Sequence, residues 1–456
     1  MKTELFEHEI TLLRDTFRRL LRRHARTNLV KLIQKTHTAD LAVIFRYFSD
    51  VEQEQVFKLM QDDESTAEFL SALDESILTN ILEREQSERI AMIVREAGSN
   101  DQGNILNSLS EDKTQSVLEL LRRDEQEEIE EILAYPEDSA GSLMSTDVFA
   151  LHQDSTSRAA LKALQDQDEA EMAFYIYVTD DDERLVGVIS LRTLAITHPE
   201  TLLSGIMIKS VHMVRAETDQ EDVAQLVAQY NYLAVPVVDG DTRLLGIVTV
   251  DDVVDVIREE ATEDFLQMAG AGKDREILNK SSWDNAKARL PWLFASWLGG
   301  ILAATVIGVY EDVLQSTIAL AAFIPVIMGM GGNIGTQSST IVVRGIATGR
   351  VDFGSEFKII MKEVTVGFIL GGLYGILLGL FAMFRFIDAP AYLGLVVGLS
   401  IGLSMLVAAA VGTIIPLFLR KVDIDPAIAT GPFVTTSVDV VGVLLYFVIA
   451  TSFLNL

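Results

Sequence analysis

Long apolar stretches separated by short polar segments fill the chain from residue 281 to its last residue. A helix needs about 20 mostly apolar residues to cross the hydrocarbon core of a bilayer. Five stretches are long enough, and the second and the last two are long enough to tilt or break. They cover residues 291–310, 314–343, 364–384, 391–419 and 427–456. The pattern predicts an α-helical membrane domain with five spans.

The polar part of the chain before these spans contains two helical patterns. Residues 1–135 place apolar side chains at helical spacing without strand alternation, which predicts an all-α superhelical domain. Residues 251–270 predict a long acidic connecting helix that leads toward the first span. Acids three or four residues apart on one helix repel each other, so this helix favours counterions. Its acids are Asp252, Asp255, Glu259, Glu260, Glu263 and Asp264.

A tandem repeat lies between the two helical segments. Met144 matches Met207, and Gly187 matches Gly246. Each copy ends in two β-branched strands that are joined by a polar turn and followed by a helix. The repeat predicts a pair of small α/β modules. The patterns together divide the chain into parts at residues 1–135, 136–200, 201–258, 259–282 and 283–456.

Charge is segregated along the chain in the same way as apolarity. The sequence has 66 acids and 37 Lys and Arg, a net charge of −29, yet the part from residue 281 onward has ten acids against nine bases. A strongly acidic soluble part disfavours nucleic acid and anionic lipid headgroups as partners and favours cations. Acidity that only aids solubility is the alternative. Because the sequence has no cysteine, disulfides and thiolate metal sites are excluded.

The loops between the spans differ in charge, which predicts their orientation. Lys and Arg are retained on the cytoplasmic side of a membrane. The basic residues are Lys287, Arg289, Arg344, Arg350, Lys358, Lys362, Arg420 and Lys421, and the opposite loops hold Glu311, Asp312, Arg385 and Asp388. The start of the chain carries acids and no long apolar core, so it does not predict a secretory signal. We expect a cytoplasmic N-terminus and an outer C-terminus.

Small residues recur every four positions in three of the spans. Such stripes let helix backbones approach closely where lipid offers no hydrophobic drive. They are Gly300, Ala304 and Gly308 in the first span, Gly371, Gly375 and Gly379 in the third, and Gly394, Gly398 and Gly402 in the fourth. We expect close packing of helices, within one chain or between two.

Asp439 is the one ionisable side chain that the sequence places well inside a predicted span. An intramembrane carboxylate is costly unless it faces a partner or water, and no basic residue lies at a similar depth. We interpret Asp439 as lining a polar path for cations. A protonated Asp439 that is hydrogen-bonded to a neighbouring helix is the alternative. Thr435, Thr436 and Ser437 add hydroxyl groups nearby.

The second span carries a matching polar segment, MGMGGNIGTQSST, at residues 328–340. Its four glycines are unfavourable in a lipid-facing helix, and Asn333 and Gln337 add polar side chains. Gly431 and Pro432 are expected to interrupt the fifth span and to free backbone carbonyls. Irregular backbone at membrane depth is tolerated where it lines a cavity. We therefore expect two glycine-broken, oxygen-rich half-spans that form a path for a hard cation.

The tandem repeat resembles a pair of CBS domains, a family of paired modules that bind adenine nucleotides or other small ligands. The family's nucleotide motif matches Gly246, Thr249 and Asp252 in the second copy, where the carboxylate would hold ribose hydroxyls. In the first copy Thr193 replaces the acid. The resemblance implies at most one full ATP site, and a pair with a purely structural role stays open.

The order of the parts resembles the MgtE family of bacterial magnesium channels over essentially the whole chain. Four markers carry the resemblance: VDDVVDVIREEATEDF at 250–265, RLPWL at 289–293, GGNIGTQ at 331–337 and DPAIATGPFVTTSVDVVG at 425–442. The resemblance implies a multi-pass protein of the bacterial inner membrane and a transporter without enzymatic activity. It further implies a homodimer whose pore lies on the two-fold axis.

The family also implies roles for individual residues. Asp439 of each chain would bind Mg²⁺ in the pore, with Asn333 and Thr435 nearby and Asp425 at the cytoplasmic mouth. Gly431 stands where some members carry asparagine, so no side chain contributes at that position. Cytoplasmic Mg²⁺ would close the pore by bridging acids of the soluble part. These acids are Asp252, Asp255, Glu260, Glu263 and Asp264, then Asp219 and Glu221, and last Asp101.

Two other functions fit parts of the sequence. A zinc-dependent membrane protease is excluded because all six histidines precede the spans. An aspartyl protease needs two acids at one depth, and a single chain offers only Asp439. Transport of another hard divalent cation, Co²⁺ or Mn²⁺, gated by nucleotide binding to the repeat, stays as the alternative.

Overall fold

The computed structural model describes residues 2–166, 174–272, 277, 280–351, 354, 356–387, 389–390, 392–422 and 424–454. Asp388 of the predicted outer loops lies outside these residues. The chain forms two compact units, Met1–Ile257 and Arg258–Leu456.

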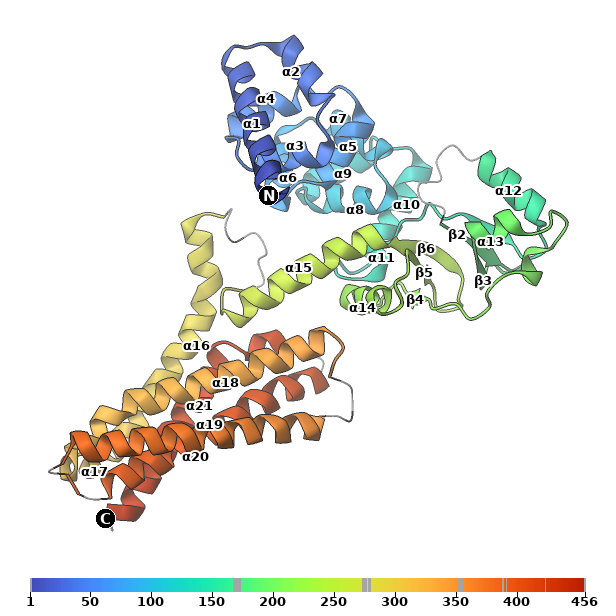
Figure 1. Ribbon diagram of the computed structural model, residues 1–456. Helices are drawn as coiled ribbons and strands as arrows, with labels where there is room; N and C mark the ends of the chain where they lie inside the picture. Colours follow the sequence, from blue (N-terminus) through green and yellow to red (C-terminus); the bar gives the residue numbers. More distant parts are fainter. Residues whose placement is uncertain are drawn as a thin grey trace. The chain divides into compact units, whose positions relative to one another are not determined.

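Short helices build the N-terminal part of the first unit, coloured blue to cyan in Figure 1. Helices of two to three turns are unstable alone, so their stability comes from a shared core. Phe45 and Phe69 are fully buried there, with ring centroids 4.6 Å apart. The predicted all-α domain is confirmed. Its helices are α1 (Lys2–Arg22), α2 (Arg26–Ile33), α3 (Thr38–Phe45), α4 (Asp50–Phe57), α5 (Asp63–Ser71), α6 (Glu75–Arg84), α7 (Ser87–Glu96), α8 (Ser99–Asn107), α9 (Glu111–Leu118) and α10 (Arg123–Leu133).

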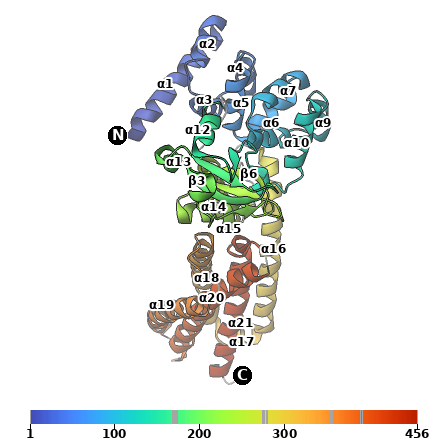
Figure 2. The same cartoon turned by 90° about the vertical axis from the view of Figure 1, so that its right-hand side faces the viewer.

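Two small sheets of three strands each follow, which confirms the predicted α/β pair (Figure 2). In each sheet the first two strands are parallel and the last two antiparallel. The register shifts at the same point of both copies, between Val178 and Thr179 and between Val237 and Val238. The first module contains α11 (Ala140–Leu143), β1 (Ala150–His152), α12 (Ser157–Gln165), β2 (Tyr175–Thr179), β3 (Leu185–Ser190) and α13 (Leu191–Ile196). The second contains η1 (Leu203–Gly205), β4 (Val214–Arg215), α14 (Gln220–Tyr230), β5 (Ala234–Val238) and β6 (Leu244–Thr249).

The residues that mark the repeat pack against one another across the two modules. A Cβ atom at Gly187 would lie 2.6 Å from Met207 Sδ, and one at Gly246 would lie 2.9 Å from Met144 Sδ and 2.7 Å from the Ser145 carbonyl oxygen. A side chain at either glycine would clash with the other module. Gly246 of the nucleotide motif therefore has a structural reason to be glycine.

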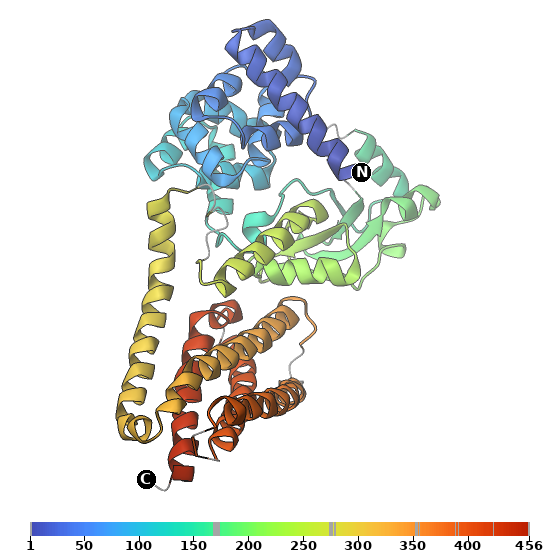
Figure 3. The same cartoon turned by 60° about the vertical axis from the view of Figure 1, so that its left-hand side comes forward.

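The second unit holds the membrane helices (Figure 3). Within the described residues, five helical segments are long and apolar enough to span a bilayer, as predicted: Ser282–Val309, Ile318–Ala347, Glu356–Arg385, Leu393–Lys421 and Pro432–Phe453. The connecting helix α15 (Val250–Met268) begins in the first unit and ends in the second. The remaining elements are α16 (Ser282–Val309), α17 (Glu311–Ser316), η2 (Ile318–Phe323), α18 (Ile324–Ala347), α19 (Glu356–Arg385), α20 (Leu393–Lys421), η3 (Pro426–Ala429) and α21 (Pro432–Leu454).

Glycines bring the backbones of α19 and α20 into contact, as the stripes predict. Cβ atoms at Gly371, Gly375 and Gly379 would each lie 2.6 Å from the carbonyl oxygens of Gly402, Gly398 and Gly394, in that order. The two helices therefore run antiparallel with no room for a side chain between them. In α16 the glycine that contacts another helix within the protomer lies one position before the predicted stripe. Nothing described lies within 4 Å of a Cβ at Gly300 or Gly308, whereas Gly299 meets Thr436.

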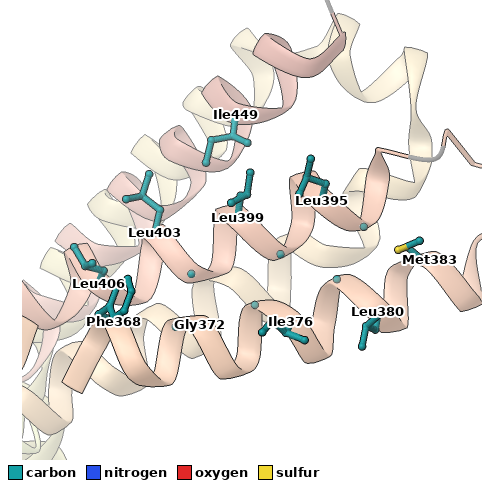
Figure 4. A pocket seen from close by; sticks show the side chains of 16 residues that line it. Phe368, Gly372, Ile376, Leu380, Met383, Leu395, Leu399, Leu403, Leu406 and Ile449 are labelled. Atoms are coloured by element: carbon teal, nitrogen blue, oxygen red, sulfur yellow. The ribbon is translucent and has the colours of Figure 1, made fainter. Parts of the chain in front are cut away.

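An apolar groove of about 860 Å³ runs along this glycine seam (Figure 4). Leu395, Leu399 and Leu403 of α20 flank it on one side, and Ile376 and Leu380 of α19 flank it on the other. No ionisable or amide side chain lines it. The groove is therefore unsuited to an ion.

Alanine substitutions at Gly375 and at Gly372 distinguish the effect of backbone packing on stability from the effect of helix propensity. Gly375→Ala should lower the free energy of unfolding by about 1–3 kcal/mol, because its methyl group overpacks against α20. Gly372→Ala should be neutral or stabilising, since nothing described lies within 4 Å of its Cβ position. Thermal unfolding of the purified protein in detergent measures both. Equal melting temperatures for the two variants would contradict the close contact between the α19 and α20 backbones at Gly375.

Candidate cation pathway

One face of α18 is polar and exposed although the helix is long enough to cross a membrane. Asn333, Gln337, Thr340 and Arg344 recur at spacings of four, three and four and are all exposed. Gly329 extends the same face by one more turn. We call these five residues the α18 polar stripe. Polar groups are costly against lipid, so the stripe needs water or a polar partner.

Asp439 of α21 lies against the same helix. Its Oδ1 atom lies 3.7 Å from the position that a Cβ atom would occupy at Gly332, next to Asn333 of the stripe. The side chain is partly exposed, and no described residue forms an ion pair with it. The structure thus brings Asp439 beside the helix that carries the stripe. Thr435, one turn earlier, shares its hydroxyl hydrogen between the carbonyls of Gly431 and Pro432, at 3.3 Å each.

Glycines on α18 and α21 permit this approach. Cβ atoms at Gly331 and Gly442 would lie 3.2 Å and 2.8 Å from Ser404 Oγ of α20. A Cβ at Gly335 would lie 3.1 Å from Val434 of α21. The three helices therefore pack closely around the level of Asp439.

The predicted glycine break in the second span is wrong. α18 is helical from Ile324 to Ala347 and passes through all its glycines without interruption. In the predicted fifth span, η3 ends at Ala429 and α21 begins at Pro432, so the helical segment is interrupted at Gly431 as predicted. Glycine costs a helix about 1 kcal/mol in water. A bilayer requires every backbone group to be bonded within its own segment, which keeps such a helix intact.

Glu363 of α19 is a buried acid of the membrane unit that the sequence analysis missed. Its side chain is 6% exposed, and its carboxylate accepts a hydrogen bond from Ser338 Oγ of α18 at 2.9 Å. The neighbouring Lys358 and Lys362 make it look like an ordinary charge at the end of a span. Its spacing of four from Gly367, which continues the stripe of Gly371, is the signal that places it on the packed face.

The end of α15 meets the segment that leads into α21. We call Glu263, Asp264, Gln267 and Asp425 the α15 junction. Gln267 Nε2 donates to Asp425 Oδ2 at 2.8 Å and to Glu263 Oε1 at 2.9 Å. Burial, with a smaller contribution from the charge of Asp425, raises the pKa of Asp264 to about 6, although Arg344 opposes this. The junction is therefore a crowded negative site.

The other predicted regulatory acids lie in or near the first unit. Asp252 Oδ1 accepts from Asn100 Nδ2 of α8 at 2.9 Å, and its Oδ2 accepts from the Thr249 hydroxyl. Burial raises the pKa of Asp252, and these hydrogen bonds oppose the rise. Asp219 caps α14 by accepting from the backbone N–H of Glu221 at 2.8 Å. Asp255 is exposed, while Asp101 and Glu260 are partly buried. Among the described residues of one chain, no three acids or histidines form a group that could hold a metal ion.

Comparison with known proteins explains this combination of parts. The MgtE family, described as a divalent cation transporter, matches residues 324–449, and the MgtE intracellular N domain matches residues 36–138. CBS domains match residues 140–196 and 203–259. The magnesium transporter MgtE of Bacillus subtilis is 32% identical over 425 residues, 93% of each chain. The chain belongs to the MgtE family.

Other MgtE proteins agree with this assignment. The magnesium transporter MgtE of Enterococcus faecalis is 39% identical over 72% of both chains. A crystal structure of the cytosolic domain of the Mg²⁺ channel MgtE in complex with ATP is 34% identical, with a TM-score of 0.51. The match covers 53% of the present chain and 99% of the cytosolic-domain chain. The MgtE assignment makes the chain a multi-pass membrane protein, as its five apolar helices require.

Substitutions of Glu363 test its contact with α18. Glu363→Gln keeps an acceptor for Ser338 and should leave stability nearly unchanged. Glu363→Ala removes the acceptor and leaves a cavity, which should lower the free energy of unfolding by about 1–3 kcal/mol. Thermal unfolding in detergent measures the difference. If Glu363→Gln were as damaging as Glu363→Ala, the hydrogen bond would not be the important contact.

Proposed function

We propose that this MgtE protein is a Mg²⁺ channel whose ions pass Asp439 along the α18 polar stripe. The exposed polar face of a membrane helix, beside an acid that forms no ion pair among the described residues, carries the proposal. The relatives at 32–39% identity are magnesium transporters. The chain would thus act by transport and not as an enzyme, with Mg²⁺ as its substrate.

The α18 polar stripe supports a homodimer. A single protomer would turn Asn333, Gln337 and Thr340 toward lipid, where their polar groups find no partner. Two copies with these faces opposed would enclose a wet path on the two-fold axis, lined by an Asp439 from each copy. Thr435 and Asn333 would contribute near this level, and Asp425 at the mouth. The remaining apolar surface, which includes the groove of Figure 4, would face lipid.

Charge explains why such a path would prefer a divalent ion. At 4 Å from one carboxylate and an effective dielectric of 20, a divalent cation gains roughly 8 kcal/mol, about twice the monovalent value, before desolvation. Mg²⁺ sheds its water reluctantly, so two carboxylates would hold it hydrated through charge and hydrogen bonds. This argument applies equally to Co²⁺ and Mn²⁺, which stay as alternative ions.

The loop charges support an orientation in the bacterial inner membrane with the N-terminus in the cytoplasm. Arg344, Lys358, Lys362 and Arg420 would then lie on the inner side. The acidic soluble part would share this compartment, where it can sense the concentration of the transported ion. Its negative charge makes nucleic acid an unsuitable partner.

We propose that cytoplasmic Mg²⁺ closes the channel by binding between acids that otherwise repel. The α15 junction supports this because Glu263 and Asp425 accept from the same amide, and burial together with the charge of Asp425 raises the pKa of Asp264. A cation there would remove the repulsion. Asp252, Asp255, Glu260, Asp219, Glu221 and Asp101 are proposed as further regulatory ligands, supported only by the family.

ATP binding at the CBS pair is a second proposed form of regulation. The ATP complex of a related MgtE cytosolic domain supports it. Gly246, Thr249 and Asp252 are the proposed contacts. In this chain Gly246 packs on Met144, and Asp252 already bonds Asn100 and Thr249. The ribose would have to share or replace these partners.

Flux measurements on Asp439 variants test the pathway. Asp439→Asn should lower Mg²⁺ flux into reconstituted vesicles by about tenfold or more, because it removes negative charge that attracts the hydrated divalent ion. Asp284→Asn, at an exposed acid of the first turn of α16, is the control and should conduct normally. Undiminished flux through Asp439→Asn would contradict the pathway.

Closure is tested by varying Mg²⁺ and ATP separately on the cytoplasmic side of the vesicles. Flux should fall as Mg²⁺ rises, and in Asp264→Asn it should fall less steeply because one bridging charge is missing. Asp251→Asn, at an exposed acid of the same helix, should behave like the unmodified protein. Closure that does not depend on Mg²⁺ in the unmodified protein would refute the bridging.

A further inference from the structure

Gln267 is a polar side chain almost completely buried at the end of α15. It is 1% exposed, although its neighbours in sequence include the partly buried Leu266 and Met268. The backbone around it closes on the start of α21. A Cβ atom at Gly431 would lie 3.2 Å from the Met268 carbonyl oxygen, and one at Gly270 would lie 3.4 Å from Pro432. The side-chain amide is thus enclosed where the two segments touch.

Both N–H groups of the Gln267 amide are directed at acids. Nε2 donates to Asp425 Oδ2 at 2.8 Å and to Glu263 Oε1 at 2.9 Å. The opposite amide orientation would place Oε1 against two carboxylates, so the charges determine which way the amide points. Gln267 therefore joins two groups of like charge, one on its own helix and one beyond α20.

Asp425 transmits this contact to the membrane helix. Its other oxygen, Oδ1, accepts from the backbone N–H of Ala427 at 2.8 Å and so caps η3. η3 is followed by Gly431 and then by α21, which carries Asp439. The amide of Gln267 thus holds the residue that shapes the entry of α21.

We propose that Gln267 is an ion-independent latch that holds the end of α15 on the start of α21. It is a positioning residue that sets how much Mg²⁺ is needed for closure. This inference rests on the proposed function, in which the α15 junction closes the pathway. The latch lowers the cost of bringing Glu263 and Asp425 together before any cation binds.

The chemistry of the amide suits this role better than that of a cation or an apolar side chain. A hydrogen bond from a neutral donor to a charged acceptor is stronger than one between two neutral groups, yet it leaves both carboxylates charged. A lysine would add one positive charge between the two carboxylates and so lower the need for Mg²⁺ in closure. Methionine would fill the same volume with no donor, so that only a cation could hold the acids together.

Two substitutions of Gln267 should shift closure in opposite directions. Gln267→Met should raise the Mg²⁺ concentration for half-closure about fivefold or more through loss of two donors to charged acceptors. Gln267→Lys should lower this concentration. Mg²⁺ flux into vesicles of the full-length protein is the measurement. The flux at low Mg²⁺ through Gln267→Met should equal that of the unmodified protein.

Gln315→Met is the matched control. Gln315 Nε2 donates to Glu311 Oε1 at 3.0 Å, the same helical contact that Gln267 makes with Glu263, but it is exposed on α17. It should not alter half-closure. In an Asp425→Asn background, where an N–H group can replace the acceptor Oδ2 while the cap at Oδ1 persists, Gln267→Met should have little further effect.

The outcomes separate the latch from the function on which it rests. If the unmodified protein conducts no Mg²⁺ or does not close with Mg²⁺, the proposed function fails. If it closes normally and Gln267→Met closes at the same concentration, the latch is refuted. A shift of Gln267→Met and Gln267→Lys in the same direction, with a lower melting temperature, would show a packing role only and would also refute it.

Discussion

Hydrocarbon offers no partner to a polar group, and the packing of the membrane unit follows from this constraint. Three of the buried polar side chains find partners on neighbouring segments: Ser338 with Glu363, Ser339 with Thr430, and the Tyr446 hydroxyl with the Leu320 carbonyl at 2.8 Å. Glycines make these contacts possible by letting the backbones approach. This packing leaves the α18 polar stripe exposed. Its polarity has no explanation within one protomer, which is why water and a second copy enter the proposal.

The α15 junction obeys a related rule for charge. Like charges that are moved out of water repel more strongly, and the raised pKa of Asp264 reflects both burial and its negative neighbour. Such a site is stable only if donors or cations compensate it. Gln267 supplies donors from within the chain to Glu263 and Asp425 without adding positive charge. Because donors within the chain compensate only part of the negative charge at the α15 junction, the strength of this contact would depend on the ion concentration.

Periodicity and composition were sufficient for the larger features of the chain. The five spans, the all-α domain and the repeated α/β module each depend on a pattern that extends over many residues, so errors at single positions do not matter. The close packing of Gly371, Gly375 and Gly379 followed from spacing alone. Single positions were harder to predict: α18 passes through its glycines without a break, and within one protomer Gly299 of α16 contacts Thr436 while Gly300 has no described neighbour.

The sequence by itself determined which segments enter the bilayer, that Asp439 lies within one of them, and that the soluble part is acidic, because these depend on local apolarity and charge. Tertiary structure decided which face of each helix is covered. In the sequence, Glu363 resembles a charge at the end of a span, but in the structure it is buried and accepts from Ser338 of α18. Gln267 resembles an ordinary helical residue, but in the structure its amide donates to Asp425. Partners distant in sequence supply the hydrogen bonds that make a buried polar group stable. Their identity depends on how the chain folds back and on no pattern within one segment.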